Sequence, residues 1–377
     1  MTAFFTWVGA FPPVVQAILV VVAFLAVVGL ILFFIDIAPR PGKIYNWIRL
    51  AMCVLIPVVL FVAFNSAWWA AAAAAVVGAI LFLLDYRARQ GKGYLIQLIA
   101  FLTPAALLLL IGLIIPSIQT FVAAFMNSSG KEFIGFDNFV WVFTQPDGIR
   151  TVANTIVWVL IAPAVSTAVG LAYAVFIDKT RGEKIYKVLV FMPMAISFVG
   201  ASIIWKFVYE YRAAEFQQIG LLNQIVVWFG GEPQQWLLVA PWNTLFLIVV
   251  LIWVQTGFAM VILSAAIKGV PTEQLEAAEL DGTNAWQSFW NVTVPAIRPA
   301  IIVVLTTISI ASLKVFDIVR TMTGGNFDTS VIANEMYTQF TKFEAGRSAA
   351  FAVILFVLVL PIVIYNARQI RLQKEIR

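Results

Sequence analysis

Long apolar runs are the feature of this sequence that most restricts its fold. A helix needs about 20 mostly apolar residues to cross a bilayer, because its backbone polar groups must be satisfied within the segment. The runs that approach this length are Val14–Ile35, Leu50–Phe64, Trp69–Tyr86, Gln97–Phe125, Val152–Ile177, Ile185–Phe207, Trp242–Ala266, Ala300–Val319 and Ala349–Tyr365. We therefore predict an all-α, polytopic membrane protein with about nine transmembrane helices.

Composition agrees with a membrane protein and argues against a metal centre. Of the 377 residues, 62% are hydrophobic and 11% are charged, whereas soluble domains have about 25% charged residues. The sequence has no histidine, so the commonest zinc ligand and neutral-pH base is missing. Its one cysteine, Cys53, has no second thiol for an intrachain disulfide. We expect no metal site in this chain.

Two runs leave the span count open. Leu50–Phe64 is short for a span, and the link to Trp69–Tyr86 is tight. Together they form either a hairpin that crosses twice or one tilted span with a re-entrant piece. These alternatives give nine or eight spans.

Basic residues predict the orientation of the chain. Cytoplasmic loops are enriched in Lys and Arg, and the first basic residue, Arg40, follows the first apolar run. With the N-terminus outside, the basic clusters fall on successive inside loops, and the C-terminal tail with Arg368 and Arg377 is cytoplasmic. The first run lacks the positive start of a secretory signal, so we interpret it as a span.

We divide the chain after Gly93. Residues 1–93 hold three extra spans, and residues 94–377 hold a six-span body with a long inside loop at 268–298. The extra spans have no polar interior suited to a site. We expect them to pack on the lipid-facing side and to serve assembly or stability.

The inside loop contains signals for two short helices. Pro271 and Gly282 are the usual start and stop residues around the first of them. The predicted helices are Thr272–Asp281 and Asn284–Val292. The second is expected to end before Pro295, with Pro299 opening the next span.

Spaced residues in this loop resemble the EAA loop of bacterial ATP-binding-cassette import permeases. That family pattern is Glu-Ala-Ala, three residues, Gly, nine residues and Ile-x-Leu-Pro. The matching residues here are Glu276, Ala277, Ala278, Gly282 and Val292 to Pro295, with Val for Ile and Val for Leu. The alternative interpretation is an ordinary amphipathic loop in which Gly and Pro only mark turns.

Other segments resemble the sugar-importing branch of this family, over about Phe101 to Arg371. The residues and segments concerned are Asp281, Phe289, Gly135–Phe139 and Gly220–Asn223. Three further segments are similar to permeases for α-glucosides and related oligosaccharides: Lys314–Val319, Thr323–Asn326 and Ala333–Tyr337.

The resemblance implies a permease subunit that moves a sugar, of the α-glucoside or oligosaccharide type, across the bacterial cytoplasmic membrane. It implies a second homologous permease, two ATPase subunits that hold ATP and Mg, an extracytoplasmic sugar-binding protein and membrane lipid as partners, and no nucleic acid. The sequence has no Gly-x4-Gly-Lys-Ser/Thr phosphate loop, so we expect no cofactor on this chain and no enzymatic activity of its own.

The residues implied in ATPase coupling are Glu276, Ala277, Ala278, Asp281, Gly282 and Pro295. A short helix with small Ala side chains can approach a partner closely, and Glu276 can pair with an Arg of that partner. Gly282 allows a sharp turn that a Cβ would obstruct.

Four residues on two spans are candidates for sugar contact: Gln255, Phe258, Ser309 and Ser312. A neutral sugar is bound by aromatic stacking and neutral hydrogen-bonding groups, and such a site is expected near the bilayer midplane. The alternative is that Ser hydroxyls bond to their own helix backbone or join helices.

Lys314 and Asp317 are three residues apart in the predicted span Ala300–Val319. We expect a local ion pair on one helix face, with a gate or receptor contact as the alternative.

Two other functions compete with the permease interpretation. An ion-coupled carrier would need buried Asp, Glu or His and internal symmetry, and neither is visible. A membrane glycosyltransferase would need paired carboxylates with a metal. The longest outside loop, 209–241, holds only Glu210, Glu215 and Glu232, in no such arrangement.

Overall fold

The computed structural model describes residues 102, 106, 109–178 and 180–375. The chain divides into two compact units, Met1–Pro116 and Ser117–Arg377. The first three predicted runs and the predicted division after Gly93 lie outside the described residues. The described part of the first unit contains a π-helical turn, η1 (Leu110–Ile114).

The second unit is built of helices. They are α6 (Ile115–Ala123, which begins just before this unit), α7 (Asp137–Thr144), α8 (Pro146–Ile177), α9 (Glu183–Phe191), η2 (Met192–Ala195), α10 (Phe198–Val208), α11 (Leu221–Trp228), α12 (Trp242–Lys268), α13 (Thr272–Leu280), α14 (Ala285–Ser288), η3 (Phe289–Thr293), α15 (Val294–Leu313), α16 (Asp317–Met322), α17 (Ile332–Thr341) and α18 (Ala345–Glu375). Among the described residues, β pairing is limited to an isolated bridge between Met126 and Phe133. The all-α prediction is confirmed for this part of the chain.

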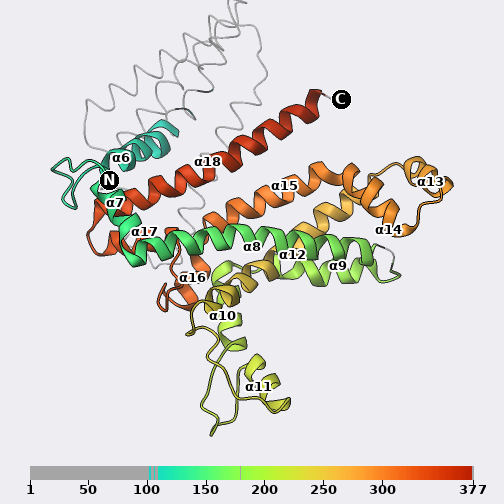
Figure 1. The fold of residues 1–377 in the computed structure, drawn as a ribbon, viewed down its shortest axis with the longest axis horizontal. Helices are drawn as coiled ribbons and strands as arrows, with labels where there is room; N and C mark the ends of the chain where they lie inside the picture. The colour runs from blue at the N-terminus through green and yellow to red at the C-terminus, as the bar shows by residue number, and fades with distance from the viewer. Residues whose placement is uncertain (1–101, 103–105, 107–108, 179, 376–377) are drawn as a thin grey trace, which may run out of the picture. The chain divides into compact units, whose positions relative to one another are not determined.

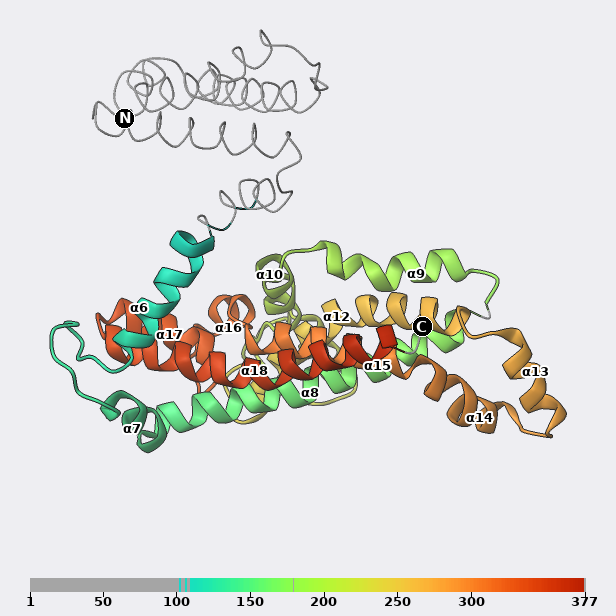
Figure 2. The same ribbon diagram turned by 90° about the horizontal axis from the view of Figure 1, so that it is seen from above.

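Four helical stretches are long and apolar enough to cross a membrane: α8, α12, Ala285–Leu313 and Ala345–Asn366 of α18. They run lengthwise beside one another (Figure 1, Figure 2). Each falls in a region where the sequence predicts a span. The described residues hold a fifth span if the bent pair of α9 and α10 crosses the membrane as one, so they do not confirm the total of about nine.

Small residues set how closely α8 packs against α12. A Cβ on Gly170 of α8 would lie 2.5 Å from the Ala259 Cβ and 2.8 Å from the Met260 backbone nitrogen of α12. Ala174 and Ile308 are fully buried in the surrounding cluster. Lipid tails are as apolar as leucine, so membrane helices associate through such close packing rather than through the hydrophobic effect.

The run predicted as one straight span at Ile185–Phe207 is broken. α9 and α10 meet at an angle of 103°. Pro193 lies in the 3-10 turn η2 and has no N–H to continue an α-helix. Ser197 then caps α10 by accepting a hydrogen bond from the Gly200 N–H at 3.1 Å. The break was hidden in the sequence because these two residues sit inside an apolar run.

The predicted span Ala300–Val319 ends at Leu313, and α16 is a separate helix. Val315 lies in the break and is buried in the cluster that α10 and α12 help to form, so tertiary packing redirects the chain here. The prediction of a one-turn pair between Lys314 and Asp317 is wrong. The two residues lie on opposite sides of the break, and no ion pair joins them among the described residues.

Candidate functional site

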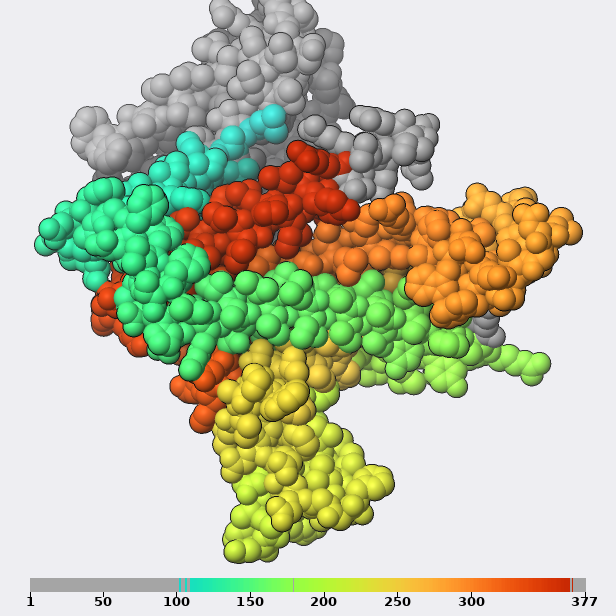
Figure 3. Space-filling view, viewed as in Figure 1, coloured from blue at the N-terminus to red at the C-terminus, as the bar shows by residue number. Residues whose placement is uncertain are grey.

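The segment 268–298 projects from one end of the long helices. Its helices α13 and α14 extend past the ends of α8 and α12, at the end opposite to α16 and α17 (Figure 1, Figure 2). The space-filling view shows the same segment as a protrusion (Figure 3). We call residues 268–298 the projecting segment.

Gly282 shapes the turn after α13. Its φ is +79°, in the left-handed region that favours glycine. The Thr283 N–H donates to the Ala278 carbonyl at 3.2 Å, and the Gly282 N–H donates to the Glu279 carbonyl at 3.0 Å. This pair of bonds is a Schellman motif. The predicted helix and its stop at Gly282 are therefore confirmed, and α13 ends at Leu280.

Asn284 begins the second helix of the segment with a capping box. The Asn284 side chain accepts from the Gln287 N–H, and the Gln287 side chain accepts from the Asn284 N–H, both at 2.9 Å. These reciprocal bonds satisfy two donors that a helix start leaves unpaired. Local bonds thus fix both sides of the turn between α13 and α14.

The prediction that the second helix ends before Pro295 is wrong. The chain is helical without interruption from Ala285 to Leu313. The Val294 N–H donates to the Phe289 carbonyl, five residues back, in the π-helical turn η3. This wider turn accommodates a proline without ending the helix, and π turns are frequent at functional sites. Pro299 lies inside α15 rather than at its start.

The coupling residues predicted on α13 differ in exposure. Ala278 faces inward and is 7% exposed. Glu276, Ala277 and Asp281 are exposed. Within the described part of the chain, the Glu276 carboxylate makes no hydrogen bond or ion pair, so it is available to a partner.

Large apolar side chains on the projecting segment were missed in the sequence. Leu280 is 89% exposed, Trp286 is 70% exposed and Trp290 is 47% exposed. The two Trp rings lie 5.6 Å apart, centroid to centroid. Two Trp close together in an otherwise polar loop were the signal that could have found them. Exposed aromatic clusters of this kind are typical of protein–protein interfaces.

Ion pairs join the ends of three helices at the base of the projecting segment. Lys187 of α9 pairs with Asp178, which follows α8, at 2.6 Å and with Glu183 at 2.8 Å. Lys268, the last residue of α12, also pairs with Glu183. The Ser264 hydroxyl donates to Asp178 at 2.8 Å. The network therefore connects α8, α9 and α12 where the chain enters the projecting segment.

The four residues predicted to contact a sugar lie on α12 and α15, which pack against each other. Gln255 and Phe258 are half-buried. The hydroxyls of Ser309 and Ser312 donate to carbonyls one turn back in α15, at 2.8 and 2.9 Å. Ser309 is half-buried and Ser312 is fully buried. Both serines therefore make hydrogen bonds to their own helix backbone, which the sequence left open as the alternative to sugar contact.

Comparison with known proteins identifies similar permeases. Residues 166–374 match the family of binding-protein-dependent transport system inner membrane components. The alpha-glucoside transport system permease protein AglF of Rhizobium meliloti is 49% identical over 270 residues, which cover 71% of this chain and 80% of that protein. The osmoprotective compounds uptake permease protein GgtC of Synechocystis is 46% identical over 278 residues, covering 74% of this chain and 100% of the relative.

A solved structure has a similar fold. It is a bacterial ABC transporter involved in the import of the acidic polysaccharide alginate, and the matching chain has a TM-score of 0.64 and 25% identity. The match covers 77% of the present chain and 98% of the other.

Proposed function

The chain belongs to the family of binding-protein-dependent transport system inner membrane components, and from this premise we propose that it is the permease subunit of an ATP-binding-cassette importer for an α-glucoside or a related oligosaccharide. It is a multi-pass protein of the inner membrane. We propose that ATP is hydrolysed on separate subunits, which is supported by the lack of a Gly-x4-Gly-Lys-Ser/Thr phosphate loop in this sequence.

The observation that best supports this proposal is the projecting segment. Closure of an ATPase subunit must move the membrane helices, which requires a rigid element that the subunit can hold. α13 ends in a Schellman motif, exposes Glu276 and Ala277, and continues through the capped helix α14 into α15. We propose that Glu276, Ala277, Asp281 and Gly282 seat α13 on an ATPase subunit, while Ala278, which faces inward, packs α13 against the rest of the projecting segment. Pro295 would then transmit movement at the π turn where α15 begins.

The exposed side chains of Leu280, Trp286 and Trp290 extend the same surface. The cores of protein–protein interfaces are rich in Trp. A Trp side chain that is buried at such an interface contributes much of the free energy of binding. We propose that these three residues flank the ATPase contact of α13.

The sugar is proposed to pass between α12 and α15. Gln255 supplies hydrogen bonds and Phe258 supplies a ring face. Ser309 retains acceptor lone pairs although its proton is used within α15. Ser312 is enclosed and becomes accessible only when α15 separates from its neighbours. The relative named for α-glucosides supports a neutral, hydroxyl-rich substrate.

The proposed partners are a second, homologous permease, two ATPase subunits and an extracytoplasmic binding protein. The family's dependence on a binding protein supports the last of these. The proposed orientation puts the projecting segment and the C-terminus in the cytoplasm and the N-terminus outside.

The test is the double variant Glu276→Lys with Gly282→Pro, co-expressed with the partner subunits. It is expected to abolish uptake of radiolabelled α-glucoside and co-purification of the ATPase while the amount of membrane-inserted protein stays normal. The control is Glu232→Lys. It makes the same charge reversal at an exposed residue outside the projecting segment. Normal amounts of a coupled ATPase with the double variant would refute the proposal.

A further inference from the structure

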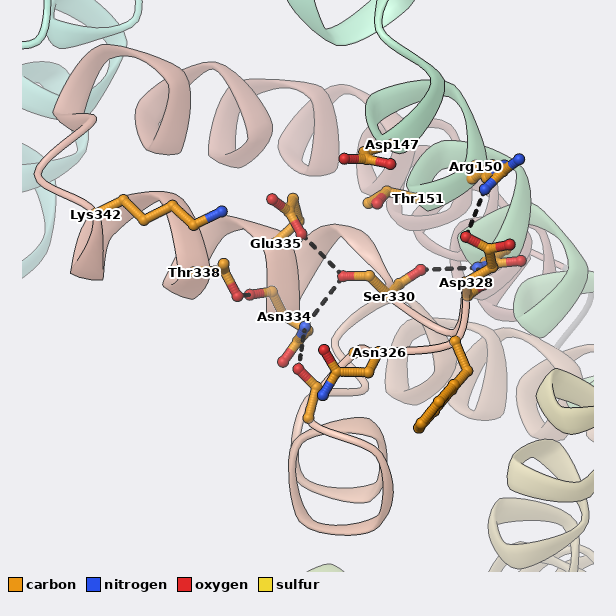
Figure 4. Close-up of a pocket in the computed structure, with 14 residues that line it drawn as sticks. Asp147, Arg150, Thr151, Asn326, Asp328, Ser330, Asn334, Glu335, Thr338 and Lys342 are labelled. Carbon is orange, nitrogen blue, oxygen red and sulfur yellow. Dashed lines mark hydrogen bonds and ion pairs between the residues drawn. The ribbon is translucent and has the colours of Figure 1, made fainter. Parts of the chain in front are cut away.

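A polar cavity of about 270 Å³ lies at the opposite end of the long helices from the projecting segment. The start of α8 forms one wall, and the chain from Gly324 to Lys342 forms the other (Figure 4). Charged and amide side chains dominate its lining, with Phe327 as the one aromatic residue among those that border it. Ligand pockets usually measure roughly 300–1,000 Å³, so this cavity suits a ligand smaller than a drug molecule.

The loop that borders the cavity is held in a strained conformation. Phe327 and Asp328 have φ angles of 56° and 61°, in the left-handed region that non-glycine residues rarely adopt. Asn243 of α12 donates to the Phe327 carbonyl at 2.7 Å, and Asn154 of α8 donates to the Asp328 carbonyl at 2.6 Å. Arg150 pairs with the Asp328 carboxylate at 2.6 Å. Side chains from two long helices therefore keep this wall in place.

The floor of the cavity contains a directed chain of hydrogen bonds. The Asn334 amide nitrogen donates to the Ser330 hydroxyl at 3.0 Å, and that hydroxyl donates to Glu335 at 3.1 Å. Gln339 donates to the other Glu335 oxygen at 2.8 Å. Figure 4 shows Asn334, Ser330 and Glu335 together at the cavity. Each donor in this series of hydrogen bonds is directed toward the Glu335 carboxylate. The direction of every hydrogen bond in the series is therefore fixed.

This arrangement leaves an acceptor unused. Asn334 is 1% exposed, and within the described part of the chain its side-chain oxygen has no hydrogen-bond partner. Glu335 is 9% exposed, and no basic side chain pairs with it among the described residues. Buried polar atoms in folded proteins are normally paired. Asn334 borders the cavity, and a ligand there that donates a hydrogen bond would satisfy this oxygen.

The mixture of groups selects the kind of ligand. Asp147, Glu335 and Asn334 offer acceptors, whereas Lys342 offers donors. A cationic ligand would meet the Lys342 ammonium group, and an anionic one would meet Asp147 and Glu335. Sugar hydroxyls both donate and accept, so a neutral sugar ring satisfies both kinds of group. Phe327, which is half exposed, also borders the cavity.

We propose that this cavity is a second sugar site, which holds one ring of the substrate before it enters the path between α12 and α15. The proposal rests on the proposed function, whose orientation puts this end of the helices outside the membrane. It adds a site on the permease itself, apart from Gln255, Phe258, Ser309 and Ser312.

The test is photolabelling of the complete transporter in lipid nanodiscs, without its binding protein, using an α-glucoside that carries a diazirine. Mass spectrometry is expected to find the label in segments 143–154 and 324–342, and methyl α-D-glucoside should compete with it. Asn334→Leu and Lys342→Ala should each lower this labelling about tenfold. That is the loss of affinity expected when one or two hydrogen bonds to the sugar are removed. Lys131→Ala, a change of an exposed lysine in another loop, should leave it unchanged.

Lys342 is exposed, so its variant folds even if loss of the buried Asn334 amide disturbs the loop. Label confined to α12 and α15, with normal uptake, would overturn the second site and leave the proposed function intact. Normal labelling of Lys342→Ala with weakened docking of the binding protein would also overturn it, because the cavity would then be a protein contact. Absence of both labelling and uptake would instead refute the proposed function.

Discussion

At the scale of single residues, the proposed function makes its clearest predictions for the backbone geometry at Gly282 and for the exposure of Gln255 on α12. Gly282 adopts a φ of +79° in a turn closed by bonds from its own N–H and from Thr283. Gln255 is half-buried and free of hydrogen bonds within the described residues. Gly282 fixes the direction in which the chain leaves α13, and Gln255 offers a polar group on α12.

Gly282→Ala tests the turn. No atom lies within 4 Å of the position that the new Cβ would take, so the effect comes from backbone strain alone. The left-handed conformation costs a non-glycine residue about 1–2 kcal/mol, which corresponds to a roughly five- to thirtyfold weaker hold on the ATPase subunit. The measurement is the affinity of the purified permease pair for the ATPase.

The control for this change is Gly269→Ala. Gly269 ends α12 with a φ of −84°, which any residue adopts, and its Cβ would make only ordinary contacts at 3.4 Å or more. Its affinity for the ATPase is expected to be unchanged. Equal losses of affinity in the two variants would show that the left-handed conformation of Gly282 does not determine binding to the ATPase.

Gln255→Ala tests the proposed sugar path. Loss of one hydrogen bond in a partly buried site costs about 1 kcal/mol, so the KM for uptake should rise roughly fivefold while assembly with the ATPase is normal. Ser312→Ala should also weaken uptake, because its hydroxyl meets the sugar once α15 moves. Thr256→Val is the control for Gln255→Ala, since Thr256 is the next residue of α12 and its buried hydroxyl donates to Ile252 within the helix. Unchanged uptake in the first two variants would remove them from the path.

At the scale of helices, ion pairs at the base of the projecting segment join α8, α9 and α12. Lys187 contacts both Asp178 and Glu183, and Lys268 shares Glu183. The Asp178 side chain is only 10% exposed. A buried carboxylate that loses its partner is costly, so the network stabilises one arrangement of the three helix ends.

Lys187→Met tests this network. Removing the charged hydrogen bond to Asp178 is expected to cost about 2 kcal/mol, which lowers the midpoint of thermal unfolding in detergent by roughly 4–8 °C. Lys184→Met is the matched control, because Lys184 is exposed on the same helix and makes no ion pair among the described residues. A similar decrease in both variants would mean that loss of any lysine on α9 has this effect.

The helices that the sequence predicted well are those with local signals. Pro271 and Gly282 bracket α13, and long apolar runs mark α8, α12 and α18. The breaks at Ser197 and Val315 were missed because both residues lie in apolar runs and tertiary packing decides where the chain turns. Pro295 was misread as a stop, because the π turn that accommodates it has no sequence signature.

At the scale of the whole described unit, the long helices connect the two ends to which we assign a function. The projecting segment lies at one end, and the polar cavity at Asn334 lies at the other (Figure 1, Figure 4). α8, α12 and α18 run from the cavity end toward the opposite end, and α15 returns. Gly170 lets α8 pack tightly against α12, and we propose that a movement of α13 is transmitted along these packed helices.

The two ends differed in how well the sequence predicted them. The spacing from Glu276 to Gly282 lies within one loop, so a linear pattern was sufficient for the projecting segment. The cavity joins Asp147 and Arg150 to residues nearly 180 positions later, such as Asp328. Contacts over that separation depend on how α8 packs in the bundle, which no local pattern encodes.

The most direct test of coupling is a photocrosslinking amino acid placed at position 277, in the complete transporter in its native membrane. Ala277 is exposed on α13. Irradiation should yield a covalent adduct with the ATPase subunit, and its amount should change when ATP is added. An adduct with the extracytoplasmic binding protein, or none with any subunit, would contradict a cytoplasmic α13 held by an ATPase.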